Sequence, residues 1–283
     1  MTQATEFNIH RKSAYADNVQ MVGDIPFFSW LDLNVTELCN RQCVFCPRID
    51  PNVYPNQNLF MSLDLVEKIG GELRALNYEG AVVLSGFGES LLHPQILHLV
   101  KALGPPLHTE LVTNGDRLTV ELIKQLFRAG LSFIAVSVYD GREQLDRLGD
   151  MFALAGCDGS RYLLRDRWHG PDQDFGLKLT NRAGTVDAGN QPPVSKDGHC
   201  FYPSYAAMVD WNGDVLLCVQ DWNKRVRFGN LNYQRLLEIW MNKDLSERRA
   251  RLALSGRHCE PCNKCNAMGT VHGNAHARAW GFY

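Results

Sequence analysis

The sequence predicts an α/β fold, in which a partial barrel of six parallel β/α units, a (β/α)6 barrel, precedes a small C-terminal α+β domain built from a β-hairpin and a helix. Three observations lead to this prediction. Short apolar runs alternate with helical patterns over residues 29–181, which is typical of a parallel sheet. Glycine, proline, aspartate and asparagine then accumulate over residues 182–198, as in a linker. Beyond the linker, Asn212-Gly213 separates two alternating runs, which is a strong hairpin signal.

The barrel strands are expected at short apolar runs between turn residues: 30–35, 81–84, 109–113, 131–138, 161–165 and 176–180. The helices between them are expected at 62–76, 94–103, 119–129 and 141–155. Ser62 and Thr119 are favoured N-cap residues, Pro94 suits a first helical turn, and Gly130 is a typical helix stop. Active sites in parallel α/β sheets lie beyond the carboxyl ends of the strands, so candidate functional residues are expected there.

The remaining segments flank this barrel. Residues 1–28 show little periodicity and are expected to form an N-terminal arm packed on the surface. The C-terminal domain is expected at 199–268, with hairpin strands at 206–210 and 214–219, a long basic amphipathic helix at 233–254, and a tail at 269–283. The run Arg248, Arg249 and Arg251 is interpreted as a solvated face of that helix. His272 and His276 are not expected to be ligands, because they lie in a glycine- and alanine-rich tail.

Composition excludes several classes of partner. The 283 residues carry a formal net charge of −2, and 45% of them are hydrophobic, which is ordinary for a globular protein. No charge excess points to nucleic acid or to a membrane surface, and no apolar run approaches the roughly 18 residues of a membrane span. The polar segment 1–18 lacks the apolar core of a signal peptide. A cytoplasmic location is therefore expected.

The chain contains nine cysteines, which is a high count for a reducing compartment. Eight of them form two groups: Cys39, Cys43 and Cys46, and then Cys200, Cys218, Cys259, Cys262 and Cys265. Clustered cysteines in such a compartment indicate metal sites rather than disulfides. Cys157 stands alone and is interpreted as a buried thiol.

The first group follows the first predicted strand with the spacing C-x3-C-x2-C. Thiolates suit iron–sulfur clusters and zinc, so a zinc site is the alternative interpretation. A cubane cluster normally takes four cysteines. With three, one iron keeps an open position where a substrate or cofactor can bind.

This motif, at the end of the first strand of a partial barrel, resembles the radical S-adenosylmethionine (SAM) superfamily. The resemblance implies that Cys39, Cys43 and Cys46 hold a [4Fe-4S] cluster, that SAM binds its open iron, and that one electron cleaves SAM to a 5'-deoxyadenosyl radical. It places Phe45 against the adenine. It places the Gly86-Phe87-Gly88-Glu89 segment, a variant of the family's Gly-Gly-Glu, near the methionine amino group.

The same resemblance assigns further roles at strand ends. Asn114 and Ser137 occupy positions where the family often contacts SAM. Arg165 is expected either to bind the SAM carboxylate or to assist deprotonation of the substrate.

The C-terminal cysteines resemble the SPASM domain of this family, or its shorter twitch form, which binds auxiliary clusters. The resemblance implies one auxiliary [4Fe-4S] cluster held by Cys200, Cys218, Cys262 and Cys265. Cys259 is then spare, although Cys265 could be the odd cysteine instead. A structural zinc ribbon is the alternative.

The resemblance implies an enzyme that abstracts a hydrogen atom from a small polar substrate such as a sugar, an aminocyclitol or a nucleotide sugar. Oxidation of a carbinol, with the auxiliary cluster as electron acceptor, is the favoured reaction. The first alternative is a radical epimerase with Cys259 or Cys265 as hydrogen donor. The next alternative is a peptide-modifying enzyme. The last is a protein without catalytic activity, either an iron–sulfur electron carrier or a zinc module. Flavodoxin or ferredoxin is the expected electron donor.

Overall fold

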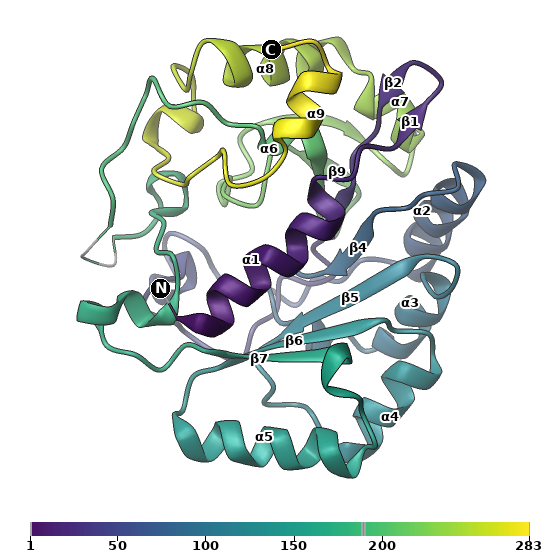
Figure 1. Ribbon diagram of the computed structural model, residues 1–283, viewed down its shortest axis with the longest axis vertical. Coiled ribbons are helices and arrows are strands. Elements are labelled where there is room, and N and C mark those ends of the chain that lie inside the picture. The colour runs from purple at the N-terminus through teal and green to yellow at the C-terminus, as the bar shows by residue number, and fades with distance from the viewer. Residues whose placement is uncertain (1, 188, 190, 283) are drawn as a thin grey trace.

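Within the residues that the computed structural model describes (2–187, 189 and 191–282), one sheet of eight strands runs through the chain in the order β10-β9-β8-β3-β4-β5-β6-β7 (Figure 1). The strands are β3 (Trp30–Leu33), β4 (Ala81–Leu84), β5 (His108–Thr113), β6 (Phe133–Val138), β7 (Tyr162–Asp166), β8 (Ala206–Val209), β9 (Asp214–Leu216) and β10 (Arg227–Asn230). Strands β8 to β7 in this order are parallel, and β9 and β10 are antiparallel additions. The predicted partial barrel is confirmed.

Four helices cover one face of the parallel strands: α2 (Leu63–Ala75), α3 (Ile96–Ala102), α4 (Val120–Arg128) and α5 (Arg142–Leu154) (Figure 1). They match the predicted helices within two residues. The Ser62 side chain accepts a hydrogen bond from the Leu65 N–H, and Thr119 caps α4 in the same way. The helices bury their apolar stripes, for example Ile69 and Leu73 of α2, against the sheet.

The predicted sixth strand at 176–180 is wrong. Pro171–Gly176 form a 3-10 turn, and residues 177–180 have no regular structure. Gly176 has a φ of 69° and packs so tightly on the end of β7 that a Cβ would overlap the Asp166 carbonyl oxygen. Its own carbonyl accepts a hydrogen bond from Thr5 Oγ1 (2.8 Å) instead of pairing with a strand. The sixth parallel strand is β8, which pairs with β3.

The predicted hairpin is confirmed and extends the barrel sheet. β8 and β9 are antiparallel and joined through Asn212-Gly213, where Gly213 has a φ of 89°. Because β8 also pairs in parallel with β3, Leu31 lies beside Ala207 in the register. The hairpin of the small C-terminal domain therefore continues the barrel sheet.

The predicted single helix at 233–254 is two helices, α7 (Leu236–Trp240) and α8 (Lys243–Leu254). The break has a local cause, because Asn242 caps α8 by accepting from the Asp244 N–H at 2.8 Å. Arg249 corrects the prediction of a solvated basic face, since it is fully buried and its guanidinium lies over the rings of Trp240 and Trp280.

The predicted N-terminal arm contains a helix, α1 (Gln3–Ala16), and a short ladder of β1 (Met21–Val22) and β2 (Ile25–Pro26). α1 crosses the face of the sheet opposite to α2–α5 (Figure 1). Many of its contacts with the sheet are polar: Arg11 pairs with the buried Glu110, and the Lys12 ammonium lies 4.1 Å from the Trp30 ring centre, while its last residue, Ala16, joins an apolar cluster with Trp30. A helix that packs through polar side chains has no apolar stripe, which is why periodicity did not reveal it.

Two short helices complete the C-terminal half, α6 (Tyr202–Tyr205) and α9 (Asn274–Ala279), the latter within the predicted tail. α9 packs on α6 and buries His276 completely. Among the described residues, no helix has the length and apolar character needed to cross a lipid bilayer.

Candidate active site

Cys39, Cys43 and Cys46 lie in the loop that follows β3, and all three line one cavity of about 230 Å³ at the carboxyl ends of the strands. The loop is fixed by its own backbone. The Cys39 N–H donates to Asn56 Oδ1 (2.8 Å), the Asn56 amide returns a hydrogen bond to the Cys39 carbonyl (2.9 Å), and the Cys46 N–H donates to the Cys43 carbonyl (2.9 Å). The three thiols are therefore presented together to one space.

The structure gathers the predicted cofactor-binding residues around the same cavity. The lining includes Phe45, Gly86, Gly88, Glu89, Asn114 and Ser137. They come from the cysteine loop and from the ends of three neighbouring strands, β4, β5 and β6. The sequence predicted this convergence from the rule that strand ends in a parallel sheet meet at one edge.

The two glycines after β4 allow a close approach to the cysteine loop. Gly86 has a φ of 140°, and a Cβ there would lie 2.6 Å from Asn34 Oδ1. A Cβ at Gly88 would overlap the Thr36 carbonyl oxygen. Phe87, inserted between them, packs its ring against Trp222, with ring centres 4.8 Å apart. The inserted residue therefore anchors the segment to the C-terminal half of the chain.

Glu89 ties three segments together from a buried position. Its carboxylate accepts hydrogen bonds from Thr113 Oγ1 (2.6 Å) and from the Asn114 N–H (2.7 Å), and its own N–H donates to the Leu38 carbonyl (2.8 Å). Burial raises the pKa of Glu89, and these hydrogen bonds oppose the rise. Asn114 in turn donates to Asn40 Oδ1 at 2.8 Å. The carboxylate holds the end of β5 against the cysteine loop.

Arg165 reaches the cavity through another residue. It lies on β7, and its Nη2 donates to Ser137 Oγ (2.9 Å), which lines the cavity. Burial, helped by the neighbouring charge of Arg167, lowers the pKa of Arg165 to about 10. Arg165 itself is not among the cavity-lining residues, so its contact with the cavity passes through Ser137.

Sequence reasoning missed further lining residues, among them Arg41, Tyr139, Arg182 and Trp222. Arg41 lies between two carboxylates, with Nε 2.7 Å from Asp116 Oδ2 and Nη1 2.9 Å from Asp140 Oδ1. These hydrogen bonds raise the pKa of Arg41. Asp116 and Asp140 follow β5 and β6, so the ion pairs of Arg41 hold the cysteine loop against the carboxyl ends of these two strands. The only sequence signal was the position of both aspartates just past strand ends.

A second cavity, of about 130 Å³, is lined by Cys200, Cys218, Cys262 and Cys265. Burial raises the pKa of the Cys262 thiol to about 12, and Cys200 and Cys265 contribute to the rise. The set of four thiols and a mostly apolar wall suits an iron–sulfur cluster. Among the described residues, no three histidine, cysteine or carboxylate side chains converge closely enough to hold one metal ion.

Cys259 lies outside this cavity, and Arg248 Nη1 approaches its Sγ to 2.6 Å. The four lining cysteines are the ones that the sequence resemblance selected as ligands. Cys265 lines the cavity with the other three, whereas Cys259, the fifth cysteine of the group, is not among the lining residues.

The two cavities meet at the turn Arg182–Gly184, where Arg182 lines the first and Ala183 lines the second. Both residues have positive φ values, 46° and 53°. Burial lowers the pKa of Arg182, and nearby groups, first Cys46 and also Cys265, oppose this. The segment predicted as a plain linker thus begins with residues of both sites. An arginine in a polar stretch gave no signal of that role.

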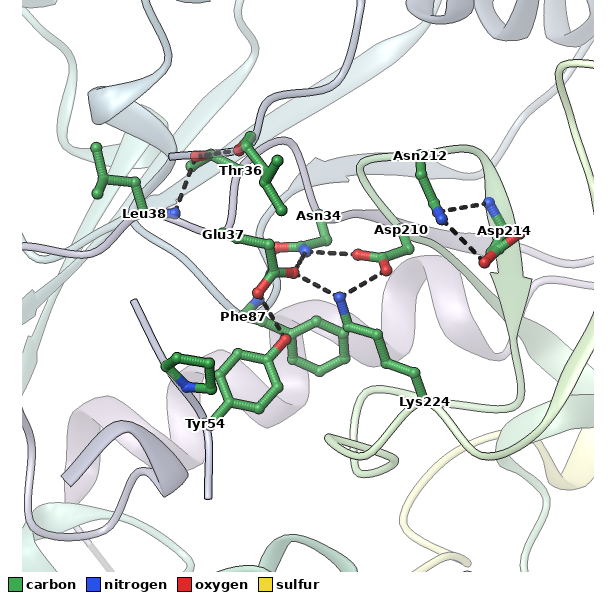
Figure 2. A network of polar contacts seen from close by, with 12 residues as sticks. Asn34, Thr36, Glu37, Leu38, Tyr54, Phe87, Asp210, Asn212, Asp214 and Lys224 are labelled. Atoms are coloured by element: carbon green, nitrogen blue, oxygen red, sulfur yellow. Dashed lines mark hydrogen bonds and ion pairs between the residues drawn. The ribbon is translucent and has the colours of Figure 1, made fainter. Parts of the chain in front are cut away.

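A buried polar network joins the two halves of the molecule (Figure 2). Lys224 Nζ lies 2.7 Å from Glu37 Oε1 and 2.6 Å from Asp210 Oδ2. Asn34 donates to both carboxylates, at 2.6 and 2.7 Å. Tyr54 OH donates to the other oxygen of Glu37 (2.7 Å). Glu37 lies two residues before Cys39, and Lys224 lies six after Cys218, so the network fixes both cysteine sites relative to each other.

Comparison with known proteins defines the class. Residues 33–151 match the radical SAM superfamily, and residues 200–266 match the SPASM iron–sulfur cluster-binding domain. The chain therefore belongs to the radical SAM superfamily and carries a C-terminal SPASM domain, as the sequence predicted. A SAM-binding cluster and an auxiliary iron–sulfur cluster follow from these two matches, in place of the zinc alternatives.

Three individual comparisons show how far the similarity extends along the chain. The chain is 28% identical over 246 residues to the S-adenosyl-L-methionine-dependent 2-deoxy-scyllo-inosamine dehydrogenase of Niallia circulans, which covers 84% of this chain and 93% of the relative. It resembles the crystal structure of BtrN in complex with AdoMet and 2-DOIA, with a TM-score of 0.72, 25% identity and coverage of 89% and 98%. The GTP 3',8-cyclase of Mannheimia succiniciproducens is 33% identical over 114 residues, which span 39% of this chain and a third of the cyclase.

Proposed function

We propose that this protein is a radical SAM dehydrogenase that oxidises a carbinol of a small polar substrate, and that the substrate is an aminocyclitol. The observation that carries the proposal is the junction of the two cavities at Arg182 and Ala183. A substrate held there lies beside both cysteine sites. The similarity along nearly the whole length of a 2-deoxy-scyllo-inosamine dehydrogenase supports the same reaction class.

The residues that would hold the cofactors are those that line the cavities. Cys39, Cys43 and Cys46 would hold one [4Fe-4S] cluster, and Cys200, Cys218, Cys262 and Cys265 a second. SAM would occupy the first cavity against Phe45, Gly86, Gly88, Glu89, Asn114 and Ser137. When bound, these groups supply one-electron chemistry, by which a carbinol gives up one hydrogen atom, one electron and one proton and becomes a carbonyl.

Two charged side chains in or next to the cavities, Asp32 and Arg182, suit an amino-bearing polyol. Asp32 accepts hydrogen bonds from Ser85 Oγ and from Tyr202 OH, both at 2.8 Å. Ser85 lines the first cavity and Tyr202 the second; the buried carboxylate of Asp32, which lines neither, joins the two hydroxyls and would attract a protonated amine bound beside them. Arg182 Nε has no hydrogen-bond partner among the described residues. It is free to bind a substrate hydroxyl.

Arg165 would position Ser137 rather than touch the substrate, because its Nη2 contact ends at Ser137 Oγ. An acidic one-electron protein, such as flavodoxin or ferredoxin, would supply the first electron, and a reducing cytoplasm would protect both clusters. We keep residues 29–181 and 199–268 as the two proposed domains; the family matches fall inside both.

The experiment uses anaerobically reconstituted, dithionite-reduced enzyme with SAM and 2-deoxy-scyllo-inosamine in D2O. We expect a ketone and 5'-deoxyadenosine in equal amounts, with no deuterium at the carbinol carbon. Deuterium at a stereoinverted carbon would establish the epimerase instead. That alternative is disfavoured because Cys259 lines neither cavity and Cys265 lies among the proposed ligands.

The Asp32→Asn variant tests the substrate class. Loss of a charge-assisted hydrogen bond should raise KM for the amino substrate by about 10- to 100-fold. The KM of scyllo-inositol, which lacks the amine, should change far less. An equal rise for both compounds would show that Asp32 does not recognise an amine.

A further inference from the structure

A basic groove lies beside the proposed auxiliary cluster site. It has a volume of about 370 Å³ between β10 and α8, and four arginines line it: Arg225, Arg227, Arg248 and Arg251. Two carboxylates, Asp244 and Glu247, also line it. The chain as a whole is slightly acidic, so this excess of guanidinium groups is local. Arg251 is exposed, and the side chain of Arg227 is 57% exposed.

The segment from Cys259 to Cys262 connects the groove arginines with the auxiliary cavity. On the groove side, Arg248 Nη1 contacts Cys259 Sγ (2.6 Å) and the Glu260 carbonyl (3.2 Å), and Arg225 pairs with Glu260 Oε2 (2.8 Å). On the other side, Cys262 lines the auxiliary cavity. Through these contacts the groove arginines reach the segment that carries Cys262.

The proposed oxidation requires that electrons be removed from the auxiliary cluster site. Each carbinol oxidised leaves one electron at the auxiliary site, and a second turnover needs that electron removed. The oxidant must be a one-electron acceptor that docks close by. Surface charge complementarity governs the encounter of such transient electron-transfer partners, whose interfaces are small.

We propose that the groove of Arg225, Arg227, Arg248 and Arg251 is the docking site of an acidic one-electron carrier of the flavodoxin or ferredoxin type, which accepts the electron from the auxiliary cluster. The carrier is reduced by one electron and the cluster is oxidised by one. This proposal rests on the proposed function for the origin of the electron. The docking itself depends only on the groove.

The test measures binding and turnover separately. Fluorescently labelled oxidised flavodoxin is titrated into the reconstituted enzyme at low and at high salt. The variant is Arg227→Glu with Arg251→Glu, which leaves Arg248 and its contact with Cys259 intact. The control reverses two exposed arginines on α4 and α5, Arg128→Glu with Arg142→Glu, far from α8 in Figure 1.

We expect the groove variant to bind flavodoxin at least about 10-fold more weakly at low salt, the control to bind within about twofold of the wild type, and high salt to reduce the difference. Basic cytochrome c, a one-electron carrier of opposite charge, should not depend on the groove arginines. Equal flavodoxin binding by the groove variant and the wild type would overturn the proposal, and so would a loss caused equally by the control.

Two further measurements separate the possible failures. Ketone formed in a single turnover, with dithionite supplying the first electron, should be equal in the groove variant and the wild type, because no carrier is needed before the auxiliary site gives up its electron. If no ketone forms in either protein, the proposed function fails while the docking result stands. Should the glutamate variant unfold, Arg227→Gln with Arg251→Gln removes the charge without reversing it, and unchanged flavodoxin binding by that variant would also overturn the docking site.

Discussion

Replacing Lys224 with methionine should destabilise the protein, because it removes the positive charge that lies between two buried carboxylates. Lys224 is the only full positive charge within 3 Å of both Glu37 and Asp210 among the described residues, and these two carboxylates are 2% and 1% exposed. The methionine side chain has a similar length and can fill the space that the lysine occupies beside the Phe87 ring. The substitution therefore isolates the charge.

The expected cost follows from the contacts that remain. Removing one partner from a buried ion pair typically costs about 3–5 kcal/mol, because the other charge stays buried. Glu37 keeps Tyr54 at 2.7 Å and Arg48 at 3.3 Å, so the loss falls mainly on Asp210, which keeps only the Asn34 amide (2.7 Å). We expect a loss of about 3 kcal/mol or more in the free energy of unfolding at neutral pH.

The pH dependence gives the sharper test. Burial raises the pKa of Asp210, and Lys224 is the first group opposing this rise. Without Lys224 the folded-state pKa rises further above the unfolded value, so the carboxyl takes up a proton as the pH falls. The cost of the substitution should therefore shrink between neutral pH and about pH 5.5.

The assay is anaerobic urea unfolding of the holoenzyme and of each variant at both pH values. Lys243→Met, at a side chain that is 87% exposed, is the matched control and should change stability by less than about 0.5 kcal/mol. Adding Asp210→Asn to the Lys224→Met variant removes the stranded charge and should recover part of the loss. A cost below 1 kcal/mol, or one that grows at lower pH, would refute the reasoning.

Three other outcomes are expected. Gly88→Ala should displace the cysteine loop, because its Cβ would overlap the Thr36 carbonyl oxygen. We expect loss of the SAM-binding cluster's absorbance and of 5'-deoxyadenosine formation. Full activity would show that the close approach at Gly88 is not needed. Cys262→Ser should remove the iron of one cluster, whereas Cys259→Ser should retain all of it; equal iron losses would place Cys259 among the ligands. Burial lowers the pKa of His276 to about 4, so the unfolded state takes up a proton first. Its contribution to stability therefore falls as the pH drops from about 6.5 towards 4, by up to roughly 3 kcal/mol. Because His272 has a similarly lowered pKa, His276→Gln should show a smaller slope than the wild type, and parallel pH curves for the two proteins would contradict the prediction.

The strand and helix pattern of the barrel could be predicted because each element carries its own signal. Ser62 and Thr119 cap the helices where the sequence placed them. The errors arose where tertiary contacts override local preference. Gly176 lies in a turn because its carbonyl binds α1, and β8 becomes the sixth parallel strand because β3 lies beside it. The polar contacts of α1 with the sheet left no periodic signal.

The candidate site divides in the same way. Phe45, Glu89 and Ser137 could be named from sequence because they follow strands or neighbour the cysteine motif, and strand ends converge in any parallel sheet. Arg182 and Arg41 could not, because their roles come from contacts with residues distant in sequence. Arg41, for example, binds Asp140 across 99 positions.

The sequence by itself determined that Cys39, Cys43 and Cys46 lie close together, because three cysteines within eight residues stay near one another in any fold. It also determined the α/β class, since hydrophobic periodicity is a local property. The tertiary structure decided that Cys265 lines the auxiliary cavity, and it brought Lys224 to Glu37 across 187 positions. Such contacts form only when the sheet closes the distance between segments, and no spacing in the chain encodes them.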